Sequence, residues 1–381
     1  MPGNAIEIDT VIIGASAAGL ATAACLKREK VPFVLLEQSG QVGSAWRNHY
    51  DRLHLHTSKG LSCLPHLVFP RQTPRYPARE QVIAYLEEYA AHFGIAPRFA
   101  QRVISLRQDG GAWLTRSEDT TYRSRHAVIA TGYTRVPHRP AWPGLESFGG
   151  PVIHSSQYRN GKEWSGRRVL VVGLGNSGGE IAIDLCEHGA RPAISVRSAV
   201  NVVPRDFLGI PILAWGIALS VLPGRLADAI AALVSRLSFG RLERLGLRQL
   251  SYGPMTQIRR EGRIPLLDVG TIERVRSGAI EVLPGVESFS KGAARFAGGL
   301  ERPFDAVVLA TGYRPALEAF LDPAAEALDS RGLPRKSGAE SAPGLFFCGF
   351  HVAPTGMLRE IAREARSIAA AIRDRSDAAR Q

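Results

Sequence analysis

The stretch FGGPVIHSSQYRNGKEWSGRRVLVVGLGNSGG, residues 148–179, determines how we interpret the whole chain. Its second half is an apolar run, VLVV, that leads into the glycine-rich turn GLGNSG at residues 173–178. In dinucleotide-binding domains a strand ends in such a turn, and the following helix offers its N-terminal N–H groups to a pyrophosphate. A similar sequence, VIIGASAAG, occupies residues 11–19. We therefore predict an α/β fold with two Rossmann-like dinucleotide-binding domains.

The two units differ at the end of their second strand, where the ribose of a dinucleotide binds. In the first unit this strand ends in Glu37, whose carboxylate can accept hydrogen bonds from ribose hydroxyls and would repel a 2′-phosphate. In the second unit the strand at 193–196 is followed by Arg197 and Ser198, which suit a 2′-phosphate. The contrast predicts FAD or NAD in the first site and NADPH in the second.

A second pair of matching sequences supports the duplication. ATGY occurs at residues 130–133 and again at 310–313, each time after a run typical of a buried strand. Glycine at a strand end allows another backbone or a cofactor to come close. We predict that the NADPH-binding domain, residues 159–305, is inserted into an FAD-binding domain made of residues 1–158 and 306–381.

Hydrophobic periodicity predicts most of the remaining elements. The predicted helices comprise residues 17–30, 79–93, 179–188 and 357–373, and the predicted strands comprise residues 7–13, 31–36, 103–106, 112–116, 125–129 and 345–350. Residues 253–270 are predicted to form a loop, and residues 271–283 a short helix and a strand. The start of the helix at 357 is expected to face the pyrimidine oxygen of a flavin.

Residues 207–223, FLGIPILAWGIALSVLP, form the most hydrophobic stretch and contain no charge. They are at the short end for a membrane-spanning helix, which needs about 20 residues, and Pro211 and Gly216 interrupt them. A basic amphipathic region follows at 225–245. The sequence leaves three roles open for 207–245: a cover over an apolar substrate cavity, an anchor at a membrane surface, or a dimer face.

Composition and charge argue against several other classes. The formal net charge is +12, but the basic residues are spread along the chain without a nucleic-acid-binding motif. The four cysteines form no CxxC pair, which argues against a disulfide framework, a zinc site and a dithiol reductase. His54 and His56 share one strand face without a third ligand, so we predict no metal site. The start, MPGNAIEIDT, does not resemble a signal peptide, so we expect a cytoplasmic protein.

The first half of the opening stretch is similar to a family signature. Phe148, Gly150, His154 and Tyr158 match the pattern FxGxxxHxxx(F/Y) of class B flavin-dependent monooxygenases, and the order of motifs agrees over nearly the whole chain. More closely, the sequence resembles the plant YUCCA flavin monooxygenases, which convert indole-3-pyruvate to indole-3-acetate. This resemblance rests on the runs YDRLHLHTSKGLSCLP, FGGPVIHSSQYRNG, VLVVGLGNSGGEIAIDLCEHGARP, VRSAVNVVPRDFLG and LDVGTIERVRSGAIEVLPGV.

The resemblance implies a reaction of FAD, NADPH, molecular oxygen and a small organic substrate. NADPH reduces FAD, oxygen adds at flavin C4a, and the resulting peroxyflavin attacks the carbonyl of an aryl-pyruvate such as indole-3-pyruvate, which loses carbon dioxide. The hydroperoxide form would instead oxygenate the nitrogen of a small amine or the sulfur of a thioether. A third possibility is a flavin reductase that passes electrons to a quinone or a partner at a membrane through residues 207–223. The oligomeric state remains open.

The candidate site residues follow from the two fingerprints and from the resemblance. Those expected to bind FAD are Gly14, Ala15, Ser16 (in place of the middle glycine), Ala17, Ala18, Gly19, Glu37, Gln38, Trp46, His56, Thr57, Val103, Thr131, Gly132 and Gly349. Those expected to bind NADPH are Gly173, Gly175, Asn176, Ser177, Gly178, Arg197, Ser198, Thr311 and Gly312.

The resemblance also suggests catalytic candidates. Many family members carry an asparagine that stabilises the peroxyflavin, and the corresponding region here reads Thr57-Ser58-Lys59. Ser58 or Lys59 is the candidate replacement. His154 is a candidate proton donor, although we prefer a role in shaping the linker between the domains.

Overall fold

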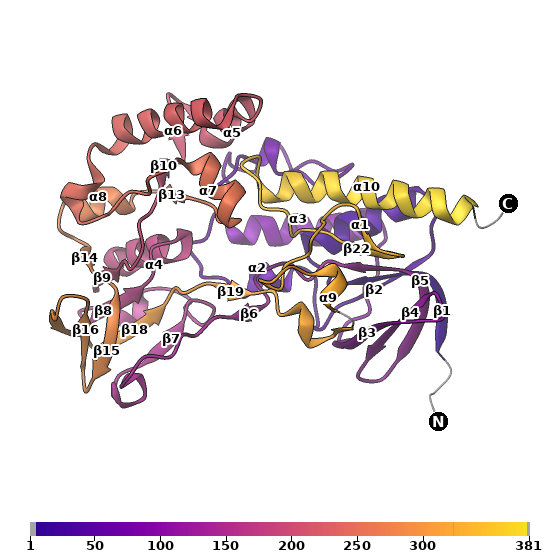
Figure 1. Ribbon diagram of the computed structural model, residues 1–381, viewed down its shortest axis with the longest axis horizontal. Coiled ribbons are helices and arrows are strands. Elements are labelled where there is room, and N and C mark those ends of the chain that lie inside the picture. Colours follow the sequence, from indigo (N-terminus) through magenta and orange to yellow (C-terminus); the bar gives the residue numbers. More distant parts are fainter. Residues whose placement is uncertain (1–4, 323, 379–381) are drawn as a thin grey trace.

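The computed structural model describes residues 5–322 and 324–378, and it contains two central sheets (Figure 1). The first sheet has the strand order β2-β1-β5-β4-β3-β20, and β22 pairs with both β5 and β21. Strands β1, β2, β5 and β22 run parallel, whereas β3 and β4 form an antiparallel extension. The bounds are β1 (Ile6–Ile13), β2 (Phe33–Leu36), β3 (Val103–Asp109), β4 (Ala112–Ser117), β5 (Thr121–Ile129), β20 (Leu321–Asp322), β21 (Glu340–Ala342) and β22 (Leu345–Phe347).

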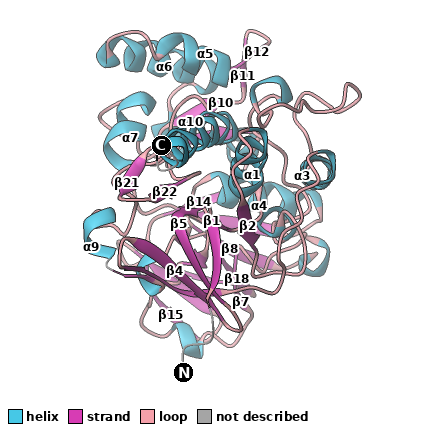
Figure 2. Cartoon of the chain, turned by 90° about the vertical axis from the view of Figure 1, so that its right-hand side faces the viewer, coloured by secondary structure: helices cyan, strands magenta, loops and turns pink. Residues whose placement is uncertain are grey.

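Helices rich in alanine and leucine cover one face of this sheet (Figure 2). Helix α1 (Ala17–Arg28) is buried from Ala17 to Leu26 because it lies between β1 and α10 (Met357–Ala378). Helix α3 (Arg79–His92) joins the same core through aromatic side chains, and α2 (Ser44–Arg47) is a single short turn. The small side chains of α1 let its N-terminus sit directly against the end of β1.

The second sheet is entirely parallel, with the order β14-β9-β8-β18-β7. Its elements are β7 (Val152–His154), β8 (Arg168–Val172), β9 (Arg191–Ser195), β14 (Glu281–Leu283) and β18 (Ala306–Leu309). One face packs on α4 (Asn176–Glu187), near α8 (Thr271–Arg276). The other face is covered by a small antiparallel sheet of β15 (Val286–Ser290), β16 (Ala293–Phe296) and β17 (Glu301–Pro303).

The strand pairing corrects one expectation about the division of the chain. The sequence division assigns β18 to the first domain, but this strand lies between β8 and β7 in the second sheet, where Leu309 is in register with Val172 and His154. Strand β7 belongs to the same sheet although the sequence division places it before residue 159. Parallel pairing of segments more than 130 residues apart leaves no local signal in the sequence.

The two ATGY sequences occupy equivalent places, which confirms the duplication. Each follows the strand that pairs with a fingerprint strand, β5 beside β1 and β18 beside β8. A Cβ atom at Gly14 would lie 2.9 Å from the carbonyl oxygen of Ala130, and one at Gly173 would lie 2.6 Å from that of Ala310. Both glycines also have positive φ, so no other residue fits these turns without strain.

Residues 199–270 form a third layer that extends from the second sheet (Figure 2). Its elements are β10 (Val202–Pro204), β11 (Asp206–Phe207), β12 (Ile210–Pro211), α5 (Ile212–Leu219), α6 (Gly224–Phe239), η4 (Leu242–Leu245), α7 (Pro254–Glu261) and β13 (Leu266–Asp268). The prediction of a loop over 253–270 is therefore wrong. Among the described residues, no helix combines the length and the apolar character needed to cross a bilayer.

Short connecting elements complete the described chain. They are η1 (Lys59–Leu61), β6 (Val136–Pro137), η2 (Leu145–Ser147), η3 (Lys162–Trp164), β19 (Tyr313–Arg314), η5 (Leu317–Ala319) and α9 (Ala324–Ala327). Strand β6 pairs with β19, so the segment after the first ATGY contacts the segment after the second. This pairing links the two nucleotide-binding units close to their glycine turns.

Candidate functional site

Two adjoining cavities, of about 410 and 330 Å³, form one groove between the two units. The smaller cavity begins at Glu37, beyond the end of β2, and the larger one reaches the start of α10. Both are lined by a shared set at the end of β1 and after β5: Ser16, Ala45, His49, Ala130, Thr131 and Thr134. Such an elongated groove over the carboxyl ends of parallel strands can hold an extended dinucleotide.

Glu37 is fixed at the narrow end of the groove. Its side chain is buried, with 4% exposed, and its Oε2 accepts a hydrogen bond from the backbone N–H of Ala15 at 2.7 Å. Oε1 accepts hydrogen bonds from the N–H of Ser39 at 3.0 Å and the hydroxyl of Ser44 at 3.3 Å. The carboxylate is therefore held in position beside the glycine turn.

Polar groups in the middle of the groove suit a bound cofactor. The hydroxyl of Thr131 is buried but has no hydrogen-bond partner among the described residues. A buried hydroxyl without a partner is costly, and a cofactor in the groove would supply one. At Gly19 a Cβ atom would lie 1.8 Å from the carbonyl oxygen of Gly14, so glycine there allows α1 to point its N-terminus into the groove.

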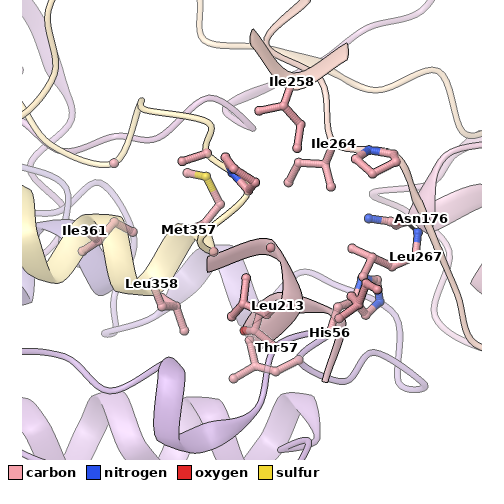
Figure 3. A pocket seen from close by; sticks show the side chains of 18 of the residues that line it. His56, Thr57, Asn176, Leu213, Ile258, Ile264, Leu267, Met357, Leu358 and Ile361 are labelled. Carbon is pink, nitrogen blue, oxygen red and sulfur yellow. Dashed lines mark hydrogen bonds between the residues drawn. The ribbon is translucent and has the colours of Figure 1, made fainter. Parts of the chain in front are cut away.

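The wide end of the groove is apolar, and helices from three parts of the chain enclose it (Figure 3). Side chains from α5, α6, α7 and α10 form the wall, among them Leu213, Leu219, Ile230, Val234, Met255, Ile258, Met357, Leu358 and Ile361. Polar side chains are few, and among the described lining residues there is neither lysine nor arginine. His54, His56, Thr57 and Asn176 are among the polar side chains that line it.

His56 connects this cavity to a buried carboxylate of the second unit. Its Nε2 is hydrogen-bonded to Oε1 of Glu180, whose side chain is only 3% exposed. Glu180 lies in α4, one turn after the second glycine fingerprint. Burial, followed by the negative charge of Glu180, raises the pKa of Tyr50 well above its usual range. The segment 50–56 is thus attached to the helix of the second unit at the edge of the cavity.

The structure brings most of the expected FAD-binding residues into the groove. Thirteen of them line one cavity or the other: Gly14, Ser16, Ala17, Ala18, Glu37, Gln38, Trp46, His56, Thr57, Val103, Thr131, Gly132 and Gly349. Ala15 contributes through its N–H to Glu37, and Gly19 through its packing against Gly14.

The expected NADPH-binding residues lie at the edge of the second sheet, next to this groove. Asn176 lines the large cavity and accepts a hydrogen bond from the N–H of Leu267 at 2.8 Å. The turn 173–178 leads into α4, and Arg197 is exposed two residues after β9. Burial and then the charges of Arg314 and Arg197 lower the pKa of His138, whose backbone N–H donates to the carbonyl of Gly312 at 2.9 Å.

Three members of the opening signature are structural. Phe148 is 1% exposed in the core beneath the small antiparallel sheet. At Gly150 a Cβ atom would lie 2.5 Å from the carbonyl oxygen of Asp305, so only glycine lets β7 approach β18. The hydroxyl of Tyr158 is fully buried and donates to Asp184 in α4 at 2.7 Å. None of the three lines the groove.

His154, the fourth member, uses both ring nitrogens to hold together the segments that follow β7 and β18 in the second sheet. The N–H of Ser156 donates to Nδ1 at 3.1 Å, which assigns the ring proton to Nε2, and Nε2–H donates to the carbonyl of Gly312 at 3.0 Å. The imidazole packs edge-on against Tyr313, with 5.0 Å between ring centres. These contacts support the role in shaping the linker, and the side chain does not line the groove.

Ser58 and Lys59 are placed away from the groove lining. The ammonium group of Lys59 donates to the backbone carbonyls of Pro70, Arg71 and Thr73, which fixes a neighbouring loop. Ser58 forms the start of η1, and its carbonyl accepts a hydrogen bond from Ser62. Their geometry is that of loop-stabilising residues, and we do not carry them forward as catalytic groups.

Several lining residues were missed, either because their element was not predicted or because the predicted element does not reveal the cavity beside it. Met255 and Ile258 come from α7, although Pro254 at the first helical position and Gly262 after the helix are recognisable start and stop signals. Met357, Leu358 and Ile361 follow helical spacing, and this pattern predicts a helix but not the cavity beside it. Thr134, Ala45 and His49 carried no local signal.

We predict that stability falls below about pH 6.5 because of one buried and one partly buried histidine, His154 and His49. Burial lowers the pKa of His154 and that of His49 below their usual value. Since the unfolded chain then binds more protons than the folded one, the free energy of unfolding decreases as the pH falls. Urea unfolding at about pH 7.5 and about pH 5.5 tests this. The variant His154→Gln should have a lower free energy of unfolding than the native enzyme at the higher pH. On acidification its free energy of unfolding should decrease by less than that of the native enzyme. An unchanged loss would contradict the assignment.

Comparisons with known proteins agree with this geometry. The flavin-binding monooxygenase-like family matches residues 8–330. The chain is 41% identical over 349 residues to a probable indole-3-pyruvate monooxygenase, YUCCA1, of Arabidopsis thaliana, which covers 89% of this chain and 84% of the relative. It is 40% identical over 350 residues to indole-3-pyruvate monooxygenase YUCCA1 of Oryza sativa subsp. japonica, with 89% and 86% covered.

Solved structures show the same fold. A mutant flavin monooxygenase from Stenotrophomonas maltophilia superposes with a TM-score of 0.75 at 24% identity, covering 97% of this chain and 99% of that one. An oxidised steroid monooxygenase bound to NADP gives a TM-score of 0.77 at 19% identity, covering 98% and 86%. Because the family match and the identity of about 40% to the plant enzymes agree over most of the sequence, the chain belongs to the flavin-binding monooxygenase-like family and is an NADPH-dependent monooxygenase that uses FAD.

Proposed function

We propose that this enzyme catalyses the oxidative decarboxylation of an aryl-pyruvate, such as indole-3-pyruvate, to the arylacetate. The observation that carries this proposal is the identity of about 40% to indole-3-pyruvate monooxygenases over 89% of the chain. The reaction consumes one oxo acid, one O₂, one NADPH and one proton. It yields one arylacetate, one carbon dioxide, one NADP⁺ and one water.

In this proposal FAD lies along the groove of the first unit. The carboxylate of Glu37 binds the ribose hydroxyls, and the N-terminus of α1 at Ser16 and Ala17 faces the pyrophosphate. Thr131 donates its unpaired hydroxyl to the cofactor. The start of α10 and Gly349 border the wide cavity and would hold the flavin end of the cofactor there. The N-terminal dipole of α10 favours negative charge on that ring.

NADPH binds at the turn 173–178 and the start of α4. The N–H groups of the first turn face its pyrophosphate, and Arg197 with Ser198 contacts the 2′-phosphate. Asn176 and His56 lie where this site meets the large cavity. When bound, the flavin accepts hydride from the nicotinamide and activates oxygen, which no side chain of the protein can do.

The large cavity excludes water and positions the substrate. Its apolar wall from α5, α6, α7 and α10 suits an indole or phenyl ring. His56 and Thr57 lie at the polar side, where Nε2 of His56 is bonded to Glu180 and the Thr57 hydroxyl to Ser62 at 2.6 Å, so the oxo acid would use the hydrogen-bonding capacity that these contacts leave. Residues of the segment 207–245 line the cavity, which supports the role of a cover that the sequence left open.

One observation favours a second candidate, the oxygenation of a neutral amine or thioether. The described lining contains no lysine or arginine to pair with a carboxylate, so uncharged substrates fit the wall equally well. A panel of indole-3-pyruvate, phenylpyruvate, an arylacetone, amines and thioethers distinguishes the two. We expect the oxo acids to stimulate NADPH oxidation most strongly and to give arylacetates by mass spectrometry. Stimulation by amines or thioethers alone, with N- or S-oxides as products, would favour the second candidate.

We predict that Arg197→Ala raises the KM for NADPH by about 30-fold or more and leaves the KM for NADH nearly unchanged. A guanidinium–phosphate contact is a charge-assisted hydrogen bond worth about 2 kcal/mol, and NADH has no 2′-phosphate. The conservative variant Arg197→Lys should recover part of the preference because it keeps the charge. Equal losses for both coenzymes would show that Arg197 does not contact the 2′-phosphate.

A further inference from the structure

The β11–β12 hairpin and the α5–α6 layer expose many apolar side chains. Eleven large apolar residues are exposed in the described part of the chain, and six of them lie between 208 and 237. We call these six the apolar cap: Leu208, Ile210, Val221, Leu226, Leu233 and Leu237. The α5–α6 layer and the β11–β12 hairpin lie at the same end of the molecule in both views (Figures 1 and 2). Concentrated exposed apolar surface marks an interaction site.

Helix α6 carries a broad apolar stripe, and the substrate cavity uses only one edge of it. Ile230 and Val234 line the cavity. Leu226, Leu233 and Leu237 recur at helical spacing on the flank of the same stripe, within about a quarter turn of the cavity side, and are 50%, 56% and 67% exposed. A helix that serves only as a cover needs apolar residues only where it meets the cavity, so the exposed flank suits a second apolar surrounding.

The hairpin of β11 and β12 ends in a turn that is unfavourable for its sequence. Leu208 and Gly209 form the turn with φ of 52° and 74°. A leucine in the left-handed region is strained, and asparagine or glycine is the usual choice in such a turn. The Leu208 side chain is nevertheless 78% exposed, so packing within the protein does not explain it. Strain of this kind, maintained at an exposed tip, points to a function there.

The charges around the apolar cap are mostly basic. Arg225, Arg236 and Arg241 are exposed on or beside α6. Asp228 accepts hydrogen bonds from the N–H groups that begin α7, and Asp206 at the base of the hairpin is paired with arginines. Glu243 is exposed beside Arg241. The apolar cap is therefore bordered by more arginines than acids.

We propose that the apolar cap and its arginines dock this enzyme onto the surface of an anionic lipid bilayer. Leucines at the tip and along α6 would enter the interface, and the arginines would pair with lipid headgroups. A symmetric contact with a second copy fits less well, because it would bring together two surfaces that each carry an excess of arginines. This contact with the bilayer does not depend on which substrate the enzyme oxidises. It would place the outer wall of the cavity at a lipid surface, from which apolar molecules can enter.

Vesicle co-sedimentation of the FAD-loaded enzyme tests the proposal. We expect binding to vesicles of phosphatidylcholine with phosphatidylserine, weaker binding to phosphatidylcholine alone, and weakening with added salt. The triple variant Leu208→Asn, Leu233→Gln and Leu237→Gln should lose about tenfold or more in affinity. Because asparagine suits the turn better than leucine, the melting temperature of this variant should be no lower than that of the native enzyme, apart from small surface effects. Its NADPH oxidation should be unchanged, since none of the three lines the cavity.

A matched variant, Ile104→Gln, removes an exposed apolar side chain from β3 in the other unit and should bind vesicles normally. Arg225→Gln with Arg236→Gln should abolish the preference for anionic lipid. Absence of vesicle binding by the native enzyme, or full binding by the triple variant, would overturn the proposal. A concentration-dependent dimer in sedimentation that the triple variant abolishes, without vesicle binding, would assign the cap to a second copy instead.

Discussion

Replacing Gly178 by alanine is expected to abolish the use of NADPH while FAD stays bound. A Cβ atom at this position would lie 2.0 Å from the carbonyl oxygen of Gly173, which is backbone and cannot move aside without shifting the turn. The start of α4 would have to leave β8, and the N–H groups that face the pyrophosphate would move with it. We expect KM for NADPH to rise more than 100-fold and the unfolding free energy to fall by about 3 kcal/mol.

Two other glycines separate the steric effect from the loss of binding. At Gly175 an added Cβ atom would have no heavy atom within 4 Å, and φ is −113°, so alanine should not disturb the fold. It would still obstruct the pyrophosphate, so Gly175→Ala should weaken NADPH binding without loss of stability. Gly60→Ala, also in open space, should change neither quantity. If Gly178→Ala retained normal stability and KM, the packing of α4 on the turn would be wrong.

Replacing Glu37 by alanine is expected to give an enzyme that is purified without FAD. The variant loses the carboxylate that accepts hydrogen bonds from Ala15, Ser39 and Ser44 and, in our proposal, from the ribose. A hydrogen bond to a charged group contributes about 2 kcal/mol, so loss of the ribose contact and of the ordered turn should weaken FAD binding by 100-fold or more. Titration of the apoprotein with FAD, followed by flavin fluorescence, measures the change.

The companion variant Glu37→Gln tests whether charge or shape matters. An amide has one oxygen, so it can still accept a hydrogen bond but cannot satisfy the N–H groups of both Ala15 and Ser39. We expect an intermediate affinity for FAD and an unchanged KM for NADPH, because Arg197 and α4 are not involved. Normal FAD content in Glu37→Ala would contradict the placement of the ribose at this carboxylate.

Local sequence predicted the parts of the fold that depend on short-range chemistry. Each glycine turn, the run of small residues in α1 and the acid or arginine at the next strand end are determined within about 25 residues, as in known dinucleotide-binding units. The ATGY repeat was informative because a strand that pairs beside a glycine turn must end in residues that allow close approach. The starts of α1 and α10 also depend on short-range sequence patterns, and both were predicted at the residues where the helices begin, Ala17 and Met357.

Features that depend on distant contacts were missed. Strand β18 lies between β7 and β8 because it pairs with strands more than 130 residues earlier in the chain. The sequence shows only that β18 is followed by the last part of the first unit, and for this reason we assigned it to that unit. The large cavity is likewise assembled from α5, α6, α7 and α10, and no one of these segments identifies it. The signature residues Phe148, Gly150, His154 and Tyr158 make their contacts within the second unit, and the sequence could not show that they stay outside the groove.

Oxygen-isotope labelling tests the proposed reaction most directly. The enzyme with FAD, NADPH and indole-3-pyruvate under ¹⁸O₂ is predicted to form indole-3-acetate with one ¹⁸O in its carboxylate, in equal amounts to the NADPH consumed and the carbon dioxide released. Mass spectrometry of the product and the NADPH absorbance give both quantities in one experiment. Consumption of NADPH with hydrogen peroxide as the only product, or indole-3-acetate without ¹⁸O, would contradict the proposal.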